Sequence, residues 1–201
     1  MKKTILFILC AALLLAVAVT GCAGTGSAAA NNTEMPKHSI VDAKTDSFGT
    51  VEQLESAAEL IVKAKRLPKE EAVITRSQNT VVSSYTFSEI KIEKIYKADG
   101  SNLKEGDILT ILENQAKDEE NNTIYHIAGY NMMVPDCEYL LFLRGASTDE
   151  KRYYVSLGVN FGTVSLNPDG REKGYAETGE EIKNSFEEYE EIWEAARKKY
   201  A

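Results

Sequence analysis

Apolar residues fill the chain without interruption from Ile5 to Val19, directly after the basic residues Lys2 and Lys3. A transmembrane helix needs about 20 apolar residues, so this run is too short to span a bilayer comfortably. A basic start, a short apolar core and small residues after it are typical of a secretory signal peptide. A buried amphipathic helix is the alternative, but its polar positions would recur every 3.6 residues, and the run contains none. The pattern therefore predicts a signal peptide over residues 1–21.

The predicted signal peptide ends at a cysteine. The motif Val19–Cys22 (VTGC) resembles the lipobox of bacterial lipoproteins, in which an aliphatic residue and two small residues precede the cysteine. That family usually has leucine where Val19 stands. The resemblance implies cleavage before Cys22, a diacylglyceryl group on the Cys22 thiol and acylation of the new amino terminus. Two or three acyl chains make a durable anchor, so the chain is expected on the outer face of a bacterial cell membrane.

Small and polar residues without periodicity follow, from Cys22 to Gly49. Gly, Ala, Ser, Asn and Thr dominate this stretch, and that composition is typical of a flexible linker. Residues 22–49 are therefore predicted to form a lipidated, flexible tether that carries the folded domain. His38 lies within the tether and is expected to have no structured role.

A β-rich domain is predicted over residues 50–176. Thr50 and Gln53 have the spacing of a capping box, which predicts a short helix through residue 58. Alternating and β-branched segments then predict strands, with Pro68 after the end of the first one. The predicted strands are 59–65, 72–76, 81–96, 108–113, 123–130, 139–143, 153–159 and 162–166. Several short strands separated by turn residues predict a barrel or a sandwich, and the order of elements argues against a doubly wound α/β fold.

Two of these strands carry further information. In residues 81–96, Tyr85 and Phe87 have the opposite parity to the isoleucines that follow, which predicts a β-bulge around residues 88–89. The run 139–143 (YLLFL) is apolar on both faces and is expected to be the most buried strand.

The last segment, residues 177–201, has the period of a helix that begins at a second capping box, Thr178 with Glu181. Apolar residues recur at spacings of four and three on one stripe, with glutamates in the first turns and basic residues in the last. The stripe comprises Ile182, Phe186, Tyr189, Trp193, Ala196 and Tyr200. A coiled-coil seam has the same spacing, but three heptads or fewer are short for one and aromatic residues are unusual there. We expect the helix to pack on its own domain rather than on a partner helix.

Charge and cysteine content narrow the classes of function. The net charge of −8 becomes −10 once Lys2 and Lys3 leave with the signal peptide. This acidic balance argues against nucleic-acid binding and against electrostatic attachment to an anionic membrane. Cys10 leaves with the signal peptide and Cys22 carries lipid, so Cys137 has no disulfide partner and the fold depends on its hydrophobic core.

The search for catalytic or metal-binding chemistry is mostly negative, because the chain lacks a glycine-rich phosphate loop, HExxH, CxxC and a nucleophile elbow. His126 is the only histidine of the predicted domain, and a lone histidine on a strand is more often structural or exposed than catalytic. Cys137 is expected to be a small buried apolar residue. These two residues are too few for a zinc site. The acidic loop 118–122 lacks the glycine and spacing of an EF-hand, so we expect a solvated loop and no metal or other cofactor.

Four phrases of the chain, residues 58–64 (AELIVKA), 88–100 (SEIKIEKIYKADG), 103–109 (LKEGDIL) and 137–143 (CEYLLFL), resemble a known family. They are similar to small, largely uncharacterised cell-surface lipoproteins of Gram-positive bacteria. The domain of those proteins is similar to the OB-type barrel of netrin-like modules, which include tissue inhibitors of metalloproteinases. The resemblance covers about residues 50–166 and implies a small antiparallel OB-like β-barrel.

The inhibitory mechanism of that family does not carry over to this chain. Such inhibitors present a free amino-terminal cysteine to the zinc ion of the target, inside a disulfide framework. Here the predicted amino-terminal residue, Cys22, would be acylated, and Cys137 has no partner for a disulfide. No residue therefore inherits a functional role from the resemblance.

The sequence thus predicts a mainly β, monomeric, lipid-anchored protein that binds a protein or an envelope component without catalysis. Aromatic residues enrich recognition surfaces, and loops 129–137 and 114–122 are where we expect the binding face. The tyrosines that can line it are Tyr85, Tyr125, Tyr130, Tyr139, Tyr153 and Tyr154. Two alternatives stay open: an envelope hydrolase that uses His126 or the acidic loop, and a passive structural lipoprotein.

Overall fold

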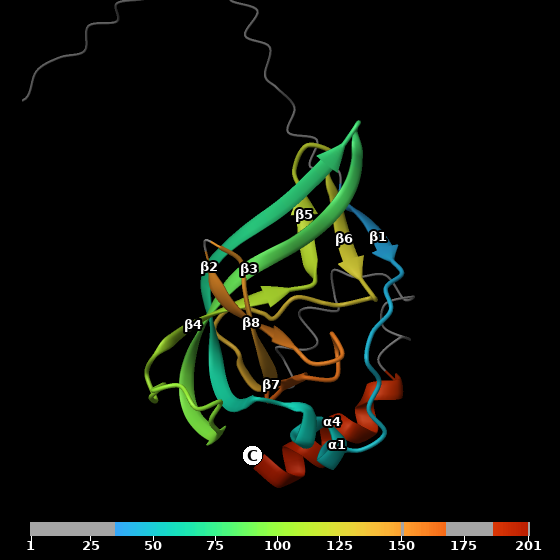
Figure 1. Ribbon diagram of the computed structural model, residues 1–201. Coiled ribbons are helices and arrows are strands. Elements are labelled where there is room, and N and C mark those ends of the chain that lie inside the picture. The colour runs from blue at the N-terminus through green and yellow to red at the C-terminus, as the bar shows by residue number, and fades with distance from the viewer. Residues whose placement is uncertain (1–34, 150, 168–186, 201) are drawn as a thin grey trace, which may run out of the picture. The chain divides into compact units, whose positions relative to one another are not determined.

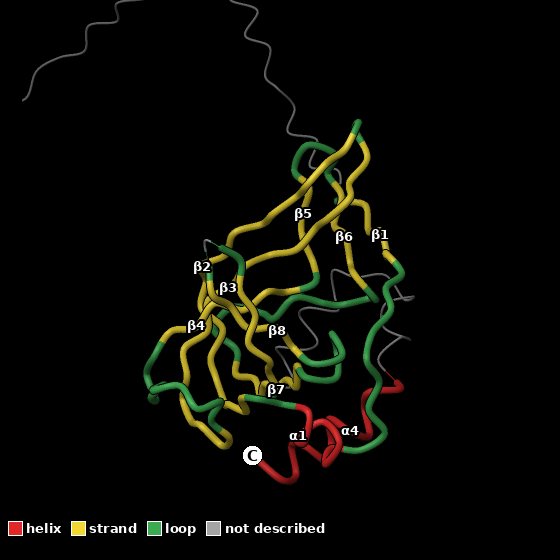
Figure 2. Tube along the Cα trace, in the orientation of Figure 1, coloured by secondary structure: helices red, strands yellow, loops and turns green. Residues whose placement is uncertain are grey.

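The computed structural model of the protein describes residues 35–149, 151–167 and 187–200. These residues form a mainly β fold with two helices, one of them C-terminal, which confirms the predicted fold class (Figure 1, Figure 2). The elements are β1 Lys37–Val41, α1 Val51–Ala57, β2 Leu60–Ser77, β3 Thr80–Lys97, β4 Ile108–Glu113, β5 Gln115–Asp118, β6 Thr123–Ile127, β7 Glu138–Ser147, β8 Arg152–Ser156, β9 Thr163–Ser165 and α4 Glu187–Tyr200. The predicted signal peptide, Cys22 and the first turns of the predicted C-terminal helix lie outside the described residues.

Five strands form a sheet that curls back on itself. β2 pairs with β3 along one edge and with β7 along the other, while β4 and β8 connect β3 to β7. These pairings are antiparallel except that of β4 with β8, which is parallel and joins only Ile111 to Tyr154 and Leu112 to Val155. The sheet is therefore barrel-like and partly closed, and the short strand β9 pairs with the start of β7.

An apolar core fills the inside of this curled sheet. Strand alternation turns the even-numbered residues of β2 and β3 and the odd-numbered residues of β4 inward. The core comprises Leu60, Val62, Ala64, Ile90, Ile92, Leu109, Ile111, Met133, Tyr139, Leu141 and Leu143. Residues 139–143 of β7 are all buried, as predicted, because β7 also packs against the helices on its outer face.

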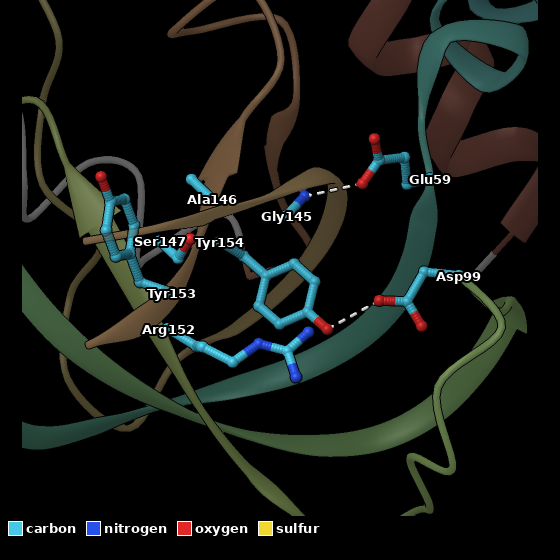
Figure 3. Close-up of a pocket in the computed structure, with 8 residues that line it drawn as sticks. All are labelled: Glu59, Asp99, Gly145, Ala146, Ser147, Arg152, Tyr153 and Tyr154. Carbon is cyan, nitrogen blue, oxygen red and sulfur yellow. Dashed lines mark hydrogen bonds between the residues drawn. The ribbon is translucent and has the colours of Figure 1, made fainter. Parts of the chain in front are cut away.

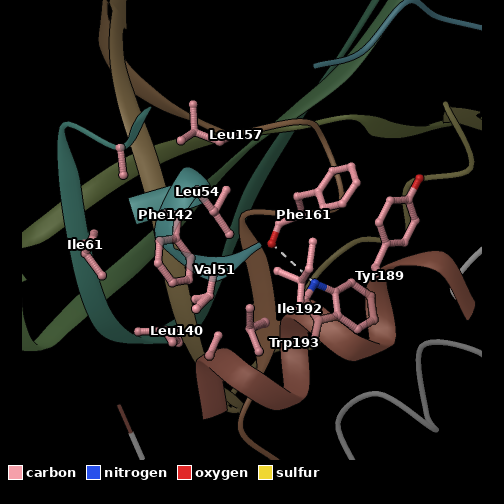
Figure 4. Close-up of a cluster of buried hydrophobic side chains, with 13 residues drawn as sticks. Val51, Leu54, Ile61, Leu140, Phe142, Leu157, Phe161, Tyr189, Ile192 and Trp193 are labelled. Carbon is pink, nitrogen blue, oxygen red and sulfur yellow. Dashed lines mark hydrogen bonds between the residues drawn. The ribbon is translucent and has the colours of Figure 1, made fainter. Parts of the chain in front are cut away.

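A second apolar core lies between the outer face of β7 and the two helices (Figure 4). Thr50 begins α1 as predicted, since its hydroxyl accepts a hydrogen bond from the N–H of Gln53 at 3.3 Å. The ring N–H of Trp193 in α4 donates to the carbonyl oxygen of Phe161, with an N···O distance of 3.3 Å. The buried helix residues are Val51, Leu54, Tyr189, Ile192, Trp193 and Ala196. α4 therefore packs on its own domain, which confirms the prediction.

The structure corrects the predicted tether for residues 37–41. They form β1, which pairs in parallel with β6 in a second, three-stranded sheet of order β1-β6-β5. His38 therefore has a structured position, next to His126. A strand of five residues shows no strong pattern of its own, because its hydrogen bonds depend on a partner far away in the sequence.

β2 runs without a break across Pro68, where the pattern predicts the end of one strand and a new strand at 72–76. The pairing with β3 shifts at this point, since Arg66 lies opposite Ile90 and Glu70 lies opposite Ser88. Four steps along β2 thus match two steps along β3, which makes a bulge. Proline lacks the N–H that a regular ladder requires, and a bulge accommodates it.

The bulge predicted in β3 is wrong, because the extra residues lie on β2. Within residues 84–92 every even position is buried, and Tyr85 and Phe87 lie on the outer face. The hydroxyl of Thr86 donates to a backbone carbonyl of β5 at 2.7 Å, and that of Ser88 accepts from a buried arginine at 3.1 Å. The parity argument failed because it took apolar character as the mark of the inside, whereas these inward positions are polar and hydrogen-bonded.

Candidate functional site

An open hollow of about 350 Å³ lies where the β7–β8 hairpin meets the beginning of β2 and the segment after β3 (Figure 3). Its lining is polar and aromatic, and it comprises Glu59, Asp99, Gly145, Ala146, Ser147, Arg152, Tyr153 and Tyr154. We call this hollow the Tyr154 pocket. Its volume is at the low end of the range for small-molecule sites.

The pairing of β7 with β8 explains why one wall carries these side chains. Gly145 lies opposite Tyr154, and Ser147 lies opposite Arg152, so both pairs share one face of the hairpin. Tyr154 also pairs with β4, whereas no β4 partner is present for Arg152. The hairpin therefore extends past the paired part of the curled sheet and forms a wall of the pocket.

Two carboxylates face this wall, and each is held by hydrogen bonds. Glu59 accepts from the N–H of Gly145 at 2.9 Å. Asp99 accepts from the Tyr154 hydroxyl at 2.7 Å and from the N–H of Ser101 at 2.9 Å. Burial alone would raise the pKa of Asp99, but the bonds from Ser101 and Tyr154 outweigh it and leave that pKa below its usual value. Asp99 is therefore ionised at neutral pH.

The Tyr154 side chain lines the pocket. Burial, followed by the bond to Asp99 and its charge, raises the pKa of Tyr154 to about 12. The hydroxyl is thus neutral at physiological pH and acts as a donor to Asp99. Figure 3 shows the exposed Arg152 side chain running along the Tyr154 ring toward Asp99. The pocket therefore presents carboxylates and a guanidinium to the same space.

Gly145 leaves room in the wall of the pocket. A Cβ atom at this position would lie 3.4 Å from Oε2 of Glu59 and 4.0 Å from a ring carbon of Tyr154, both of which line the pocket. These are ordinary contact distances, so an alanine fits there, while a larger side chain would extend toward the lining residues.

A row of aromatic rings adjoins the pocket on the outer face of the sheet. Tyr85 and Phe87 meet edge to face with ring centroids 5.2 Å apart, and Phe87 meets Tyr153 in the same manner at 5.2 Å. The ammonium of Lys151 lies 4.1 Å from the centre of the Phe87 ring. The three rings are half-buried, and Tyr153 belongs to both the row and the pocket. We call Tyr85, Phe87 and Tyr153 the aromatic row.

The tyrosines expected to line a binding face fall into two groups. Tyr85, Tyr153 and Tyr154 come together at the aromatic row and the pocket. Tyr130 and Tyr139 are instead buried inside the molecule, where burial raises the pKa of each phenol. The remaining one, Tyr125, is half-buried on β6, in a different sheet.

The two histidines form an end-to-end pair. Nδ1 of His38 lies 2.9 Å from Nε2 of His126, and the ring centroids are 5.1 Å apart, so the rings meet nearly edge to edge. Nδ1 of His126 lies 2.9 Å from the carbonyl oxygen of Tyr130 and donates to it. His126 is fully buried, and this burial lowers its pKa. His126 is thus structural, with both ring nitrogens bonded.

A buried carboxylate next to the histidine pair belongs to a separate polar network. Glu113 accepts from the Tyr130 hydroxyl at 3.0 Å and from the N–H of Met133 at 2.7 Å. Its other oxygen lies 3.6 Å from Nε of Arg66, which is also fully buried. Burial raises the pKa of Glu113 in spite of these partners. The network joins β2, β4 and the loop before β7, and sequence reasoning missed it.

The acidic loop and Cys137 also have structural roles. The predicted polar loop 114–122 contains β5, and Asp118 at its end is buried and bonded to Arg76 and to the amide of Asn121. The bond from Asn121, followed by that from Arg76, keeps the pKa of Asp118 below its usual value. Cys137 is a half-buried free thiol packed against the inner core. Within the described parts of the chain, no three His, Cys, Asp or Glu side chains gather as metal ligands would.

Of the residues that line the pocket, only Tyr153 and Tyr154 were singled out from the sequence. Glu59, Asp99 and Arg152 are ordinary charged residues in different parts of the chain, and no short motif links them. The hollow also involves neither loop 129–137 nor loop 114–122. Only the pairing of the strands brings the pocket residues together.

No family model matches the chain, and no curated protein is significantly similar to it. Neither helix in the described ranges has the length and apolar character that crossing a bilayer would require.

Proposed function

We propose that the protein is a lipid-anchored binding protein on the outer face of a bacterial cell membrane. The support for the anchor is in the sequence: a short apolar run behind Lys2 and Lys3, and a lipobox-like motif that ends at Cys22. The acidic net charge disfavours electrostatic attachment to an anionic membrane, so the lipid would carry the attachment.

The observation that carries the binding role is the Tyr154 pocket with the aromatic row at its rim. Side chains of both charges face one hollow, and half-exposed aromatic rings continue from it across the outer face of the sheet. Ligand sites commonly combine a concave shape, aromatic surface and a few convergent polar groups. The domain thus binds an envelope component or a protein through this face, without catalysis.

A hydrolase would use His126 or the acidic loop 118–122, but residues of both are bonded to other groups. His126 is buried and bonded at both ring nitrogens, and Asp118 is bonded to Arg76. A general base needs access to the proton that it removes. These contacts therefore favour binding over the hydrolase alternative.

The anchor is tested by substituting cysteines one at a time and separating membranes from the soluble fraction. Cys22→Ala is expected to leave the protein unprocessed or to release it, while the matched control Cys137→Ala stays lipidated and membrane-bound. Mass spectrometry of the mature amino terminus reports the acyl chains. Normal amounts of mature, membrane-bound Cys22→Ala protein would refute the anchor.

The binding role is tested by photo-cross-linking in intact cells. A photoreactive phenylalanine analogue replaces Tyr153 at the rim, and the control position is the exposed Glu119. We expect a defined adduct from position 153 that is absent from position 119 and disappears when Asp99→Asn and Arg152→Gln are added. Identical adducts from both positions, or none, would favour a passive structural lipoprotein.

A further inference from the structure

The Tyr154 pocket holds charges of both signs in positions set by the backbone. Arg152 and Tyr154 share the pocket-facing side of the β7–β8 hairpin. Glu59 lies just before β2 and is tied to that hairpin by the N–H of Gly145. Asp99 lies just after β3 and is tied to it by the hydroxyl of Tyr154. The two carboxylates are thus fastened to the wall that carries the guanidinium.

Both carboxylates keep acceptor capacity for a ligand. A carboxylate offers about four lone-pair sites. Glu59 uses one of them, for Gly145, and Asp99 accepts from Tyr154 and from both the side chain and the N–H of Ser101. A primary ammonium carries three donors and one positive charge, and it therefore complements the acceptor oxygens of these carboxylates.

The guanidinium of Arg152 supplies the complementary half of the site. This side chain is exposed, and the structure gives it no ion-pair partner among the described residues. Arg152 is nevertheless close enough to Tyr154 that its charge acts on the phenol, opposing the rise in the pKa of that hydroxyl. A planar guanidinium recognises a carboxylate through two parallel hydrogen bonds.

We propose that the Tyr154 pocket binds a small zwitterion that carries a primary ammonium and a carboxylate, the chemistry shared by free amino acids and dipeptides. The ammonium lies against Glu59 and Asp99, and the carboxylate lies against Arg152. The hollow of about 350 Å³ limits the size of the occupant. This inference rests on the proposed function and names the class of ligand for the same site.

The experiment uses isothermal titration of residues 22–201 with Cys22→Ala, expressed without the predicted signal peptide, against a defined set of probes. The probes are the L and D forms of alanine, lysine, glutamate and dialanine. The tightest of these is then compared with its N-acetyl and carboxamide derivatives, which remove the ammonium and the carboxylate separately. Removal of either charged group from the probe is expected to weaken its binding about tenfold or more, because a charge-assisted hydrogen bond is lost.

Variants assign each blocked group to its partner. Arg152→Gln is expected to weaken the parent probe about tenfold and to leave the affinity of its carboxamide unchanged. Asp99→Asn is expected to weaken the parent and the carboxamide alike while it keeps an acceptor for Tyr154. Gly145→Val places a side chain in the wall and is expected to abolish binding, with the exposed Ser83→Val on β3 as the matched control. Circular dichroism confirms that every variant is folded.

Three results would overturn the proposal: no probe binds at about 10 mM, a blocked derivative binds as well as its parent, or Gly145→Val and Arg152→Gln bind as the wild type does. The cross-linking at position 153 is independent of these titrations. A specific adduct without zwitterion binding would leave the binding role in place and remove only this class of ligand.

Discussion

The packing of α4 on β7 makes a quantitative prediction at Trp193. This side chain is 4 % exposed and lies in the core between the helices and the sheet, against Tyr189 (Figure 4). A tryptophan buries about 150–250 Å², which at about 25 cal/mol per Å² gives an upper estimate of roughly 4–6 kcal/mol. Large-to-small substitutions of buried aromatic residues cost about 3–5 kcal/mol. We therefore expect Trp193→Ala to lower the free energy of unfolding by about 3–5 kcal/mol.

A graded series separates the apolar contribution from the hydrogen bond. Trp193→Phe keeps a ring but loses the donor to the Phe161 carbonyl, so we expect a loss of about 1–2 kcal/mol. Glu194→Ala, on the exposed side of the same helix, is the control and should stay within about 0.5 kcal/mol of wild type.

Urea titration followed by far-UV circular dichroism measures these changes, since Trp193 is the only tryptophan and its substitution removes that fluorescence signal. A loss of 3–5 kcal/mol corresponds to a fall in Tm of roughly 6–20 °C for a domain of this size. If Trp193→Ala lost less than about 1 kcal/mol, the helix would not be docked on its own domain and the packing argument would be refuted.

Three further predictions concern pH, backbone packing and the cap of α1. Burial holds the pKa of His126 below 6.5 in the folded protein. As pH falls from about 7 toward 5, the unfolded chain therefore takes up a proton at this residue that the folded chain does not, and the urea midpoint should fall. His126→Gln should show a smaller fall in the midpoint than wild type. Gly162→Ala should cost about 1–3 kcal/mol in urea unfolding, because the new Cβ would lie 2.6 Å from the Phe142 carbonyl oxygen, whereas Gly49→Ala should leave the midpoint unchanged or higher. Thr50→Ala should cost about 1 kcal/mol by the same assay, and Thr50→Ser should retain most of the stability; equal losses in the two variants would contradict the capping role.

The predicted and observed folds agree where a pattern is local. β4 was predicted at its observed bounds, and the strip of α4 that includes Trp193 and Ala196 was found from its helical period. Both signals depend on residues close together in the chain, and burial of one face follows directly from them.

The differences arise where long-range partners decide the structure. β1 is a strand because β6 lies next to it, and Pro68 stays inside β2 because the extra residues form a bulge opposite β3. Thr86 and Ser88 face inward because each forms a hydrogen bond with a polar partner there. No local pattern in the sequence predicts any of these partners.

The candidate site could not be predicted from the sequence for the same reason, because it too depends on long-range strand pairing. Its acidic residues, Glu59 and Asp99, lie far from Arg152 along the chain, and each is an unremarked charge in its own segment. The aromatic character of Tyr153 and Tyr154 was noticed, but which tyrosines share a face depends on strand register. The pocket exists only once the hairpin and the two segments opposite it are in place.

Because β1 pairs with β6, fewer residues connect the folded domain to the predicted lipid on Cys22. A tether through Gly49 would offer 27 residues beyond Cys22, whereas the ordered β1 begins at Lys37, only 15 residues after it. Fully extended, 15 residues reach about 50 Å and 27 residues about 90 Å. The effective concentration set by a flexible tether falls roughly as the −3/2 power of its length, so the shorter connection raises it about 2.4-fold. If Cys22 is acylated, two short strands and a histidine pair thus raise the effective concentration of the pocket toward ligands held close to the membrane.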